Sequence, residues 1–313
     1  MLKGGLVLGQ MAALLVSTAL FACTQEVAEN EETVSGESEA IIGGSPATSA
    51  KFGAVGALVF YIPEFGVADV FCSATLVGPK AVVTARHCTP QIQAAFDGGF
   101  VPAVAFGPDA FNPTQVVPIT DYVNAPNTPG NGLLMDGGRD VAVAHLASKP
   151  TGVVPAKLGA FSECDVGKKF EIAGYGVYNS DHFYGAKHAG KATARAIKGK
   201  WYPLLFSNNY KAYLNWYFTD SSDTTPTQAE ADDWWKSFKL ETNYELLAGG
   251  LKNEAVACNV DSGGPLLSGS TANNLTVHGV AFAVENTRST ACGLGSGYLV
   301  FNDKMLKFVK GAI

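Results

Sequence analysis

Short apolar runs, separated by glycine and proline, fill much of the chain between residues 54 and 301. The clearest are Ala54–Phe60, Val70–Val77, Ala81–Ala85, Val101–Phe106, Val141–Leu146, Phe170–Ala173, Val277–Val284 and Gly297–Phe301. Short runs of this kind, rich in valine and bounded by turn residues, are typical of β-strands. Many short strands with turns between them predict an all-β fold.

A helical period is convincing only at the C-terminal end. Asn302 can cap a helix there, because its side-chain oxygen suits the unpaired N–H groups of a first turn. Leu306, Val309 and Ile313 then recur at the spacing of one helix face. We therefore predict a single C-terminal helix over residues 302–312.

The first residues of the chain have a different pattern and belong outside the predicted fold. Lys3 precedes an apolar stretch at 6–22, as in a secretory signal peptide, which we assign to residues 1–22. The ending Leu20-Phe21-Ala22-Cys23 resembles a bacterial lipoprotein box, in which Cys23 carries lipid. An ordinary signal peptide and an uncleaved membrane anchor are the alternatives. Each of them takes the chain out of the cytoplasm.

The next segment, residues 23–40, is acidic and offers little to bury. It carries six glutamates and no basic residue, so we predict a disordered linker or propeptide. Residues 1–40 hold one lysine against six glutamates, a net charge of −5, whereas the whole chain has −6. Residues 41–313 therefore carry only −1, which gives no overall attraction for nucleic acid or an anionic membrane.

Three separated motifs carry the candidate chemistry. A serine lies within Cys258–Pro265 as Asp261-Ser262-Gly263-Gly264, a histidine within Thr84–Cys88, and an aspartate in Arg139-Asp140-Val141. Serine is a weak nucleophile unless a base takes its proton and an acid orients that base. The order His87, Asp140, Ser262 supplies the three roles.

With these motifs in this order, the chain resembles the trypsin/chymotrypsin-like serine endopeptidases. Phe71–Leu76 and Val82–Cys88 resemble the family's histidine-bearing hairpin, and Ile41–Gly44 resembles its mature N-terminus. The resemblance spans about residues 41–313. It implies two six-stranded antiparallel β-barrels, a C-terminal helix, protein or peptide substrates, and neither cofactor nor metal.

The resemblance divides the domain into barrels at residues 41–155 and 156–301, with the site in the cleft between them. His87 and Asp140 fall in the first half and Ser262 in the second. His87 would take the serine proton and Asp140 would orient the imidazole. The backbone N–H groups of Val260 and Ser262 would form the oxyanion hole.

The resemblance also implies a zymogen. A cut between Ala40 and Ile41 would free the ammonium of Ile41, which would pair with the buried carboxylate of Asp261. Val256 would lie at the floor of the substrate pocket, Val284 on its wall and Ser296 opposite. Without an acid, and with valine on the wall, we expect a shallow pocket for small apolar P1 residues. Ala40 is such a residue, so the cut is made either by the protein itself or by an unrelated protease.

The chain has six cysteines, and export permits disulfides. The resemblance implies the pairs Cys72–Cys88 and Cys258–Cys292. A lipid on Cys23 would leave Cys164 as a lone thiol, and without that lipid Cys23–Cys164 can tether the propeptide. A lipid-anchored precursor in the bacterial outer membrane or periplasm would be released by the cut after Ala40 and secreted.

Three departures from the family pattern support other hypotheses. Val260 stands where the family has glycine, and a β-branched residue is strained if φ is positive. Phe282 and Ala283 replace residues that usually support the aspartate and wall the cleft. One alternative is a catalytically weak homologue that binds peptide or protein as a lipoprotein, and another is a structural adaptor.

An aromatic-rich insertion in the second half contains all four tryptophans, Trp201, Trp216, Trp234 and Trp235. It forms either an aromatic flap that selects substrate or a small hydrophobic core of its own, and we favour the second. His182 and His188 have no cysteine partners nearby, so we expect solvated histidines there rather than a zinc site.

Overall fold

The computed structural model describes residues 41–126, 139–179, 182–219, 225–285 and 292–313. The predicted signal peptide, the acidic segment, Cys23 and Ala40 lie outside these residues. No helix in the described ranges combines the length and the apolar character that a membrane span requires.

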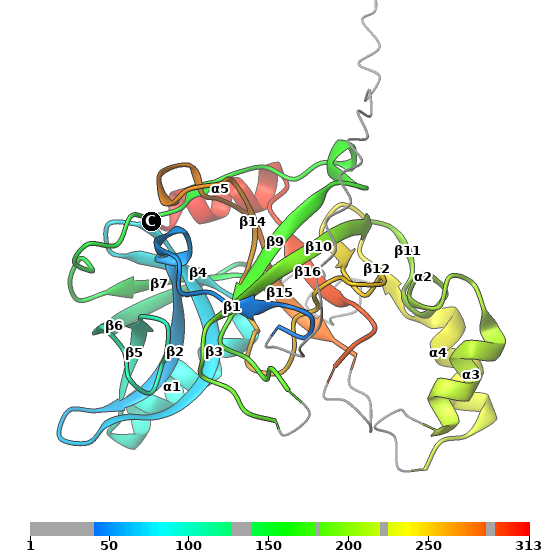
Figure 1. Cartoon of the computed structure of the whole chain (residues 1–313), viewed down its shortest axis with the longest axis horizontal. Coiled ribbons are helices and arrows are strands. Elements are labelled where there is room, and N and C mark those ends of the chain that lie inside the picture. Colours follow the sequence, from blue (N-terminus) through cyan, green and yellow to red (C-terminus); the bar gives the residue numbers. More distant parts are fainter. Residues whose placement is uncertain (1–40, 127–138, 180–181, 220–224, 286–291) are drawn as a thin grey trace, which may run out of the picture. The chain divides into compact units, whose positions relative to one another are not determined.

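Six strands of the first half form a closed antiparallel barrel (Figure 1). They are β2 (Val55–Ile62), β3 (Gly66–Gly78), β4 (Ala81–Thr84), β5 (Val101–Phe106), β6 (Gln115–Asn124) and β7 (Ala142–Leu146), in the order β2-β3-β4-β7-β6-β5. Val55, Leu58, Leu76 and Val104 on these strands are completely buried. Burial of such branched side chains supplies the main favourable term in folding.

Six strands of the second half close into a ring. They are β9 (Lys169–Gly174), β10 (His188–Ala196), β13 (Glu245–Ala248), β16 (Ser296–Val300), β15 (Thr276–Val284) and β14 (Pro265–Ser268). The ring closes because β14 and β10 both pair with β9. Two short strands lie beside it, β1 (Ser45–Pro46) on β10 and β8 (Lys157–Leu158) on β15. The predicted fold, two six-stranded antiparallel barrels, is confirmed.

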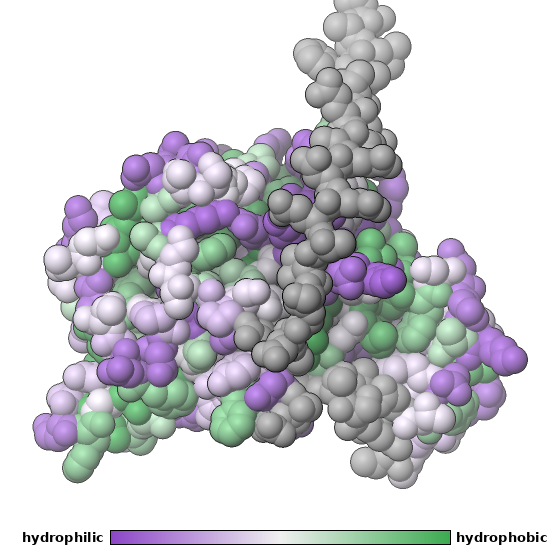
Figure 2. Space-filling view, in the orientation of Figure 1, coloured by the Kyte–Doolittle hydropathy of each residue, from purple (hydrophilic) through white to green (hydrophobic). Residues whose placement is uncertain are grey.

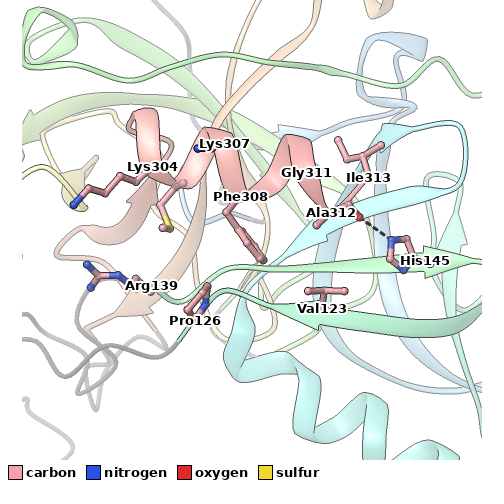
Figure 3. A pocket seen from close by; sticks show the side chains of 11 residues that line it. Val123, Pro126, Arg139, His145, Lys304, Lys307, Phe308, Gly311, Ala312 and Ile313 are labelled. Carbon is pink, nitrogen blue, oxygen red and sulfur yellow. Dashed lines mark hydrogen bonds between the residues drawn. The ribbon is translucent and has the colours of Figure 1, made fainter.

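The predicted C-terminal helix is present as α5 (Asp303–Gly311). The side chain of Asn302 caps it by accepting hydrogen bonds from two backbone N–H groups of the first turn. At its other end, the carbonyl of Ala312 lies 2.7 Å from Nε2 of His145 on β7 (Figure 3). This contact ties the last turn of the chain to the first barrel.

The expectation of only one helix is wrong. Helix α1 (Thr89–Gly98) follows the short 3-10 helix η2 (Arg86–Cys88), and Gly99 ends it with φ +79°. Three other 3-10 helices are η1 (Ala50–Phe52), η3 (Glu163–Asp165) and η4 (Ala272–Asn274). The helical signal of α1 was missed because Ile92 and Ala95 are its only buried apolar side chains.

Residues 199–240, here called the aromatic insertion, contain the remaining helices. These are α2 (Trp201–Leu205), α3 (Tyr210–Thr219) and α4 (Gln228–Ser237), between the paired strands β11 (Gly199–Lys200) and β12 (Lys239–Leu240). Their rings pack on one another in one hydrophobic cluster that includes Trp201, Tyr202, Tyr213, Trp216 and Tyr217. Hydrophilic residues lie along the outer edge of the insertion, at the right of Figure 2. The aromatic side chains thus form a core of their own.

The expectation of two solvated histidines holds for His182, which is exposed, but is wrong for His188. His188 is buried on β10 and stacks on Tyr178, with ring centroids 4.9 Å apart. Its Nδ1 lies 3.0 Å from the carbonyl of Ala186. The stacking partner belongs to the loop before β10, and sequence spacing alone did not predict that contact.

Candidate active site

Ser262 lies in a tight turn that leads from Cys258 into β14. The N–H of Asp261 donates to the carbonyl of Cys258 at 3.0 Å, and the N–H of Gly264 donates to the carbonyl of Asp261 at 2.7 Å. Gly263 has φ +80°, and a Cβ there would lie 2.1 Å from Oγ1 of Thr84. Only glycine fits, because the turn presses against β4 and uses a left-handed conformation.

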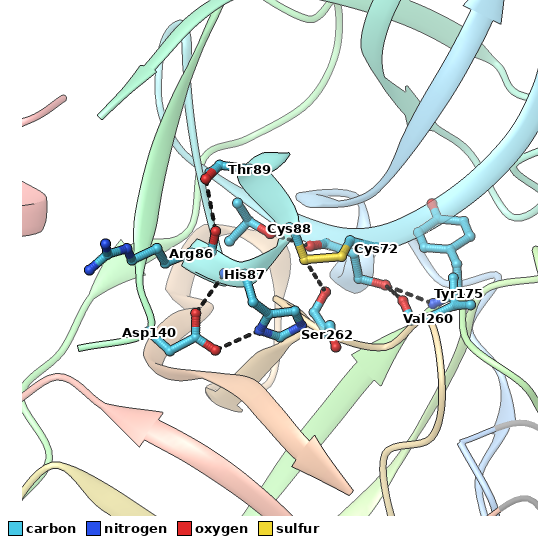
Figure 4. Close-up of a disulfide and its surroundings, with 11 residues drawn as sticks. Cys72, Arg86, His87, Cys88, Thr89, Asp140, Tyr175, Val260 and Ser262 are labelled. Carbon is cyan, nitrogen blue, oxygen red and sulfur yellow. Dashed lines mark hydrogen bonds and ion pairs between the residues drawn. A yellow bond between two sulfur atoms is a disulfide. The ribbon is translucent and has the colours of Figure 1, made fainter. Parts of the chain in front are cut away.

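His87 lies on η2, directly after β4, and Asp140 holds it twice (Figure 4). The backbone N–H of His87 donates to Oδ1 of Asp140 at 2.8 Å, and Nδ1 lies 2.6 Å from Oδ2. The Asp140 side chain is completely buried, whereas that of His87 is 39 % exposed. Since Oδ2 accepts from Nδ1–H, Nε2 is the nitrogen left to act as a base.

The serine turn and the histidine meet at the disulfide Cys72–Cys88. Sγ of Cys88 lies 3.8 Å from the carbonyl oxygen of Ser262, and a ring nitrogen of His87 lies within 4.8 Å of both sulfurs. Figure 4 shows the imidazole beside Ser262. Nε2 of His87 and Oγ of Ser262 make no hydrogen bond within the described ranges. The two sulfurs are bonded to each other, so this cluster offers no thiolate ligands for a metal.

The backbone N–H groups of Val260 and Ser262 are fixed in direction, but neither is used in a hydrogen bond within the described residues. The carbonyl of Asn259 accepts the N–H of Val177 at 2.9 Å, and in a trans peptide this directs the N–H of Val260 the opposite way. The carbonyl of Asp261 is likewise held by Gly264, which directs the N–H of Ser262 away from that bond. Neither the Val260 nor the Ser262 N–H donates to any acceptor in the described part of the chain.

Val260 keeps this geometry with φ +75°, in the left-handed region that favours glycine. For a β-branched residue this conformation costs about 1–3 kcal/mol. The protein therefore needs other contacts to hold Val260 in this conformation.

Ser73 supplies such contacts, and sequence reasoning missed it. Its Oγ donates to the carbonyl of Val260 at 3.3 Å and accepts the N–H of Tyr175 at 3.0 Å, and its own N–H donates to the carbonyl of Ser262 at 2.8 Å. Ser73 is completely buried. The only signal in the sequence is its place beside Cys72, which forms a disulfide next to His87.

Asp261 is a buried carboxylate without a cation in the described residues. Its oxygens accept the N–H groups of Gly176 at 2.7 Å and Cys258 at 2.9 Å. Burial raises the pKa of Asp261 to about 7, because desolvation disfavours the charged form. A Cβ on Gly174 or Gly176 would lie 2.0 Å and 2.4 Å from the nearest carboxyl atoms, so glycine is required at both positions.

The proposed partner of Asp261, Ile41, is buried in the core of the second barrel. The next residue, Ile42, forms a β-bridge with Val256, whose N–H donates to the Ile42 carbonyl at 3.0 Å. The segment that would carry a new N-terminus thus already lies on the second barrel.

The three predicted pocket residues lie around the second disulfide, Cys258–Cys292. Val284 on β15 is paired with Ser296 on β16. Oγ of Ser296 accepts the N–H of Ala257 at 2.7 Å, next to Val256. Val284 packs against the cluster that contains both cysteines. Both disulfides are the pairings that the resemblance implies, and Cys164 is also disulfide-bonded.

Phe282 is buried in the hydrophobic core and lies at a register shift in β15, between Ala281 and Ala283. A cavity of about 750 Å³ lies elsewhere, between α5 and the first barrel. Arg139, Lys304, Met305 and Phe308 are among its lining residues (Figure 3), but His87, Asp140 and Ser262 are not.

A comparison with protein-family models matches residues 41–196 to the trypsin family. The match ends with β10, immediately before the aromatic insertion. These findings support the trypsin-like serine protease family. Melanization protease 1 of Drosophila melanogaster is 23% identical over 276 residues, which cover 81% of this chain and 60% of that protein. The chain thus spans less than two thirds of that relative.

Two solved structures share the fold. Neuropsin, a serine protease expressed in the limbic system of mouse brain, matches with a TM-score of 0.55 and 18% identity, covering 86% of this chain and 98% of neuropsin. The GrC structure matches with a TM-score of 0.52 and 19% identity, covering 86% of this chain and 96% of GrC. At these identities the likeness concerns the double-barrel fold.

Proposed function

We propose that this chain is a serine endopeptidase that hydrolyses peptide bonds with Ser262, His87 and Asp140. One observation carries the proposal. Asp140 holds both the backbone N–H and Nδ1 of His87, while Nε2 faces the serine turn without a hydrogen bond. This is the arrangement that a base needs to take the proton of a serine hydroxyl.

In the proposed reaction, Oγ of Ser262 bonds to the substrate carbonyl carbon and gives its proton to Nε2 of His87. The C–N bond then breaks, and the imidazolium returns the proton to the leaving amine. Water releases the acyl group by the same two proton transfers. The unpaired N–H groups of Val260 and Ser262 would stabilise the oxyanion, each worth roughly 10²–10³ in turnover.

We further propose that the enzyme is made as a zymogen and is activated by a cut between Ala40 and Ile41. The buried, unpaired carboxylate of Asp261 supports this, because an ammonium is the partner that such a group lacks. Replacing Ala40 with arginine tests self-cleavage. Blocked maturation of the isolated protein is expected, and unchanged processing would point to another protease.

We propose a preference for small apolar P1 residues. Val256 is buried and Val284 is partly buried. The Ser296 hydroxyl accepts the backbone N–H of Ala257. Since none of the three side chains carries a charge, the pocket has nothing to pair with a lysine or arginine at P1. Substrates with alanine at P1 should be cleaved faster than those with arginine or lysine.

We propose an exported enzyme, since two disulfides in the described ranges suit an oxidising compartment. Anchoring through a lipid on Cys23, in the bacterial outer membrane or periplasm before the cut and secretion after it, stays a prediction. The disulfide bond of Cys164 favours the other alternative, in which Cys23 carries no lipid. Mass spectrometry of the purified precursor tests it by the presence or absence of a lipid adduct on Cys23.

The deciding experiment is hydrolysis of a P1-alanine peptide by protein that starts at Ile41, with Ser262→Ala as the control. Turnover by the wild type alone is expected. The strained Val260 favours one alternative, a weak homologue that binds peptide without cleaving it. Saturable peptide binding without turnover in correctly processed protein would support that alternative and overturn the proposal.

A further inference from the structure

We propose that the aromatic insertion positions both walls of the predicted substrate pocket and thereby sets which P1 side chains enter it. The inference rests on the proposed function. It assigns a specificity role to residues that lie outside the catalytic machinery, chiefly Trp201 and Tyr202 of helix α2.

The first wall is held through Glu285, which directly follows Val284 at the end of β15. Nε1 of Trp201 donates to Oε2 of Glu285 at 3.1 Å, and the hydroxyl of Tyr202 donates to Oε1 at 3.2 Å. Helix α2 therefore holds both oxygens of one carboxylate next to the pocket wall. Burial raises the pKa of Glu285 to about 7, so the two hydrogen bonds, rather than a full charge, fix this side chain.

The second wall is held by packing. Leu294, two residues before Ser296, lies against the hydrophobic cluster of the insertion. A Cβ on the intervening Gly295 would lie 3.0 Å from a methyl of Leu205 and 2.9 Å from a methyl of Leu247. The chain that enters β16 thus runs directly over the end of α2.

Helix α2 is itself fixed, so it can act as a brace. Trp201 and Tyr202 are 2 % and 3 % exposed, and Tyr202 contacts the rings of Tyr213, Trp216, Trp234 and Phe238. Arg195 on β10 donates to the carbonyl of Leu204 at 2.6 Å and to that of Gly249 at 3.2 Å. The brace is therefore anchored on the second barrel.

These contacts distinguish the proposal from an aromatic flap that binds substrate directly. The rings of Trp201 and Tyr202 are buried and their polar atoms are bonded to Glu285, so they present no free face to a peptide. Their effect on specificity must pass through the position of Val284 and Ser296.

The test is the double variant Trp201→Phe and Tyr202→Phe in protein that starts at Ile41. It removes both hydrogen bonds to Glu285 and keeps aromatic rings at both positions. The ratio of kcat/KM for P1-alanine over P1-phenylalanine peptides should fall about tenfold, because looser walls admit a larger side chain. The change should lie in KM, and the rate of labelling by a small fluorophosphonate should stay the same.

Tyr210→Phe is the matched control, since Tyr210 also bonds a carboxylate of the insertion, that of Asp232, but on its outer side. It should leave the ratio unchanged. Glu285→Gln should also keep the ratio, because an amide can accept from Trp201 and donate to the Tyr202 oxygen. Glu285→Ala should shift it as the double variant does.

An unchanged ratio in an active double variant overturns the inference, as does an equal loss on both substrates. If the wild type cleaves no peptide, the proposed function fails. Backbone hydrogen exchange then tests separately whether helix α2 holds the two walls in place. The double variant should then exchange faster than Tyr210→Phe in segments 282–285 and 294–297. Equal exchange in both variants rejects the positioning role.

Discussion

Two histidine–aspartate pairs lie on the first barrel, and they differ in what the second ring nitrogen meets. His87 uses Nδ1 on the buried Asp140, and its Nε2 makes no hydrogen bond in the described residues. His145 uses Nδ1 on Asp121, which is 61 % exposed, and its Nε2 lies 2.7 Å from the carbonyl of Ala312. The pairs have the same chemistry, but only the first leaves a nitrogen for a reaction.

The protonation states follow from these partners. A neutral imidazole has one N–H, so His145, with an acceptor at each nitrogen, must be the imidazolium to satisfy both. The hydrogen bond to Asp121, and then that to Ala312, raises the pKa of His145. His87 has an acceptor at Nδ1 only, the carboxylate of Asp140, and Nε2 meets none in the described residues. An aspartate beside a histidine therefore predicts a catalytic pair only when the other nitrogen is free.

Replacing the two aspartates separately should give the largest contrast. Asp140→Asn should lower kcat by about 10⁴, because it favours the wrong imidazole tautomer. Asp121→Asn is the matched control and should leave kcat for a P1-alanine peptide unchanged. Equal activity of the two variants would contradict the assignment of His87 and Asp140.

The first pair works only if the serine turn presents its donors, so Ser73→Ala should reduce turnover. The hydrogen bond from Ser73 holds the carbonyl of Val260 and so keeps this residue in its left-handed conformation. Without it Val260 can relax and turn its N–H away, at a cost of roughly 10²–10³ if that oxyanion donor is lost. Thr84→Val is the control, because Thr84 donates to the carbonyl of Ser73 at 2.8 Å without touching Val260. Steady-state kinetics should separate the two variants, and similar kcat values would reject the role of Ser73.

Val260→Gly should remove the strain of the left-handed backbone without removing the N–H. We expect a gain of about 1 kcal/mol in the free energy of unfolding, which is the strain relieved less the entropy cost of glycine. Urea unfolding of Ser262→Ala protein with and without the change measures it. A loss of stability would show that the valine side chain contributes more than its backbone costs.

The smallest expected effect belongs to the second pair. Since the folded-state pKa of His145 is raised, the pair stabilises the fold below about pH 6.5 and this contribution is lost as pH rises through the folded value. For a pair this exposed we expect about 0.2–1 kcal/mol. The stability difference between wild type and His145→Gln should shrink from acid to alkaline pH, and a constant difference would contradict the charged state.

The fold and the motif residues could be predicted because their signals are local. Apolar runs bounded by turn residues marked five strands of the first barrel, all but β6, and three of the second, β9, β15 and β16. Asp261–Gly264 contains its own turn residues, and Thr84–Cys88 contains one cysteine of a disulfide. Asn302 marked the start of α5 in the same way.

The rest depends on contacts between distant positions. Ser73 meets Val260 across 187 residues, and His145 meets Ala312 across 167. In the aromatic insertion, composition indicated a hydrophobic core, but the link from Trp201 to Glu285 spans 84 residues. No periodicity or motif specifies such pairs, since they arise only when the barrels and the insertion pack.

The most direct test of the account is the site and rate of fluorophosphonate labelling in protein that starts at Ile41, read by peptide mass spectrometry. We predict one adduct, on Ser262, that forms roughly 10² times more slowly, or slower still, in His87→Ala protein, because the general base is lost. An adduct on another residue, or equal labelling without His87, would contradict a serine activated by that imidazole.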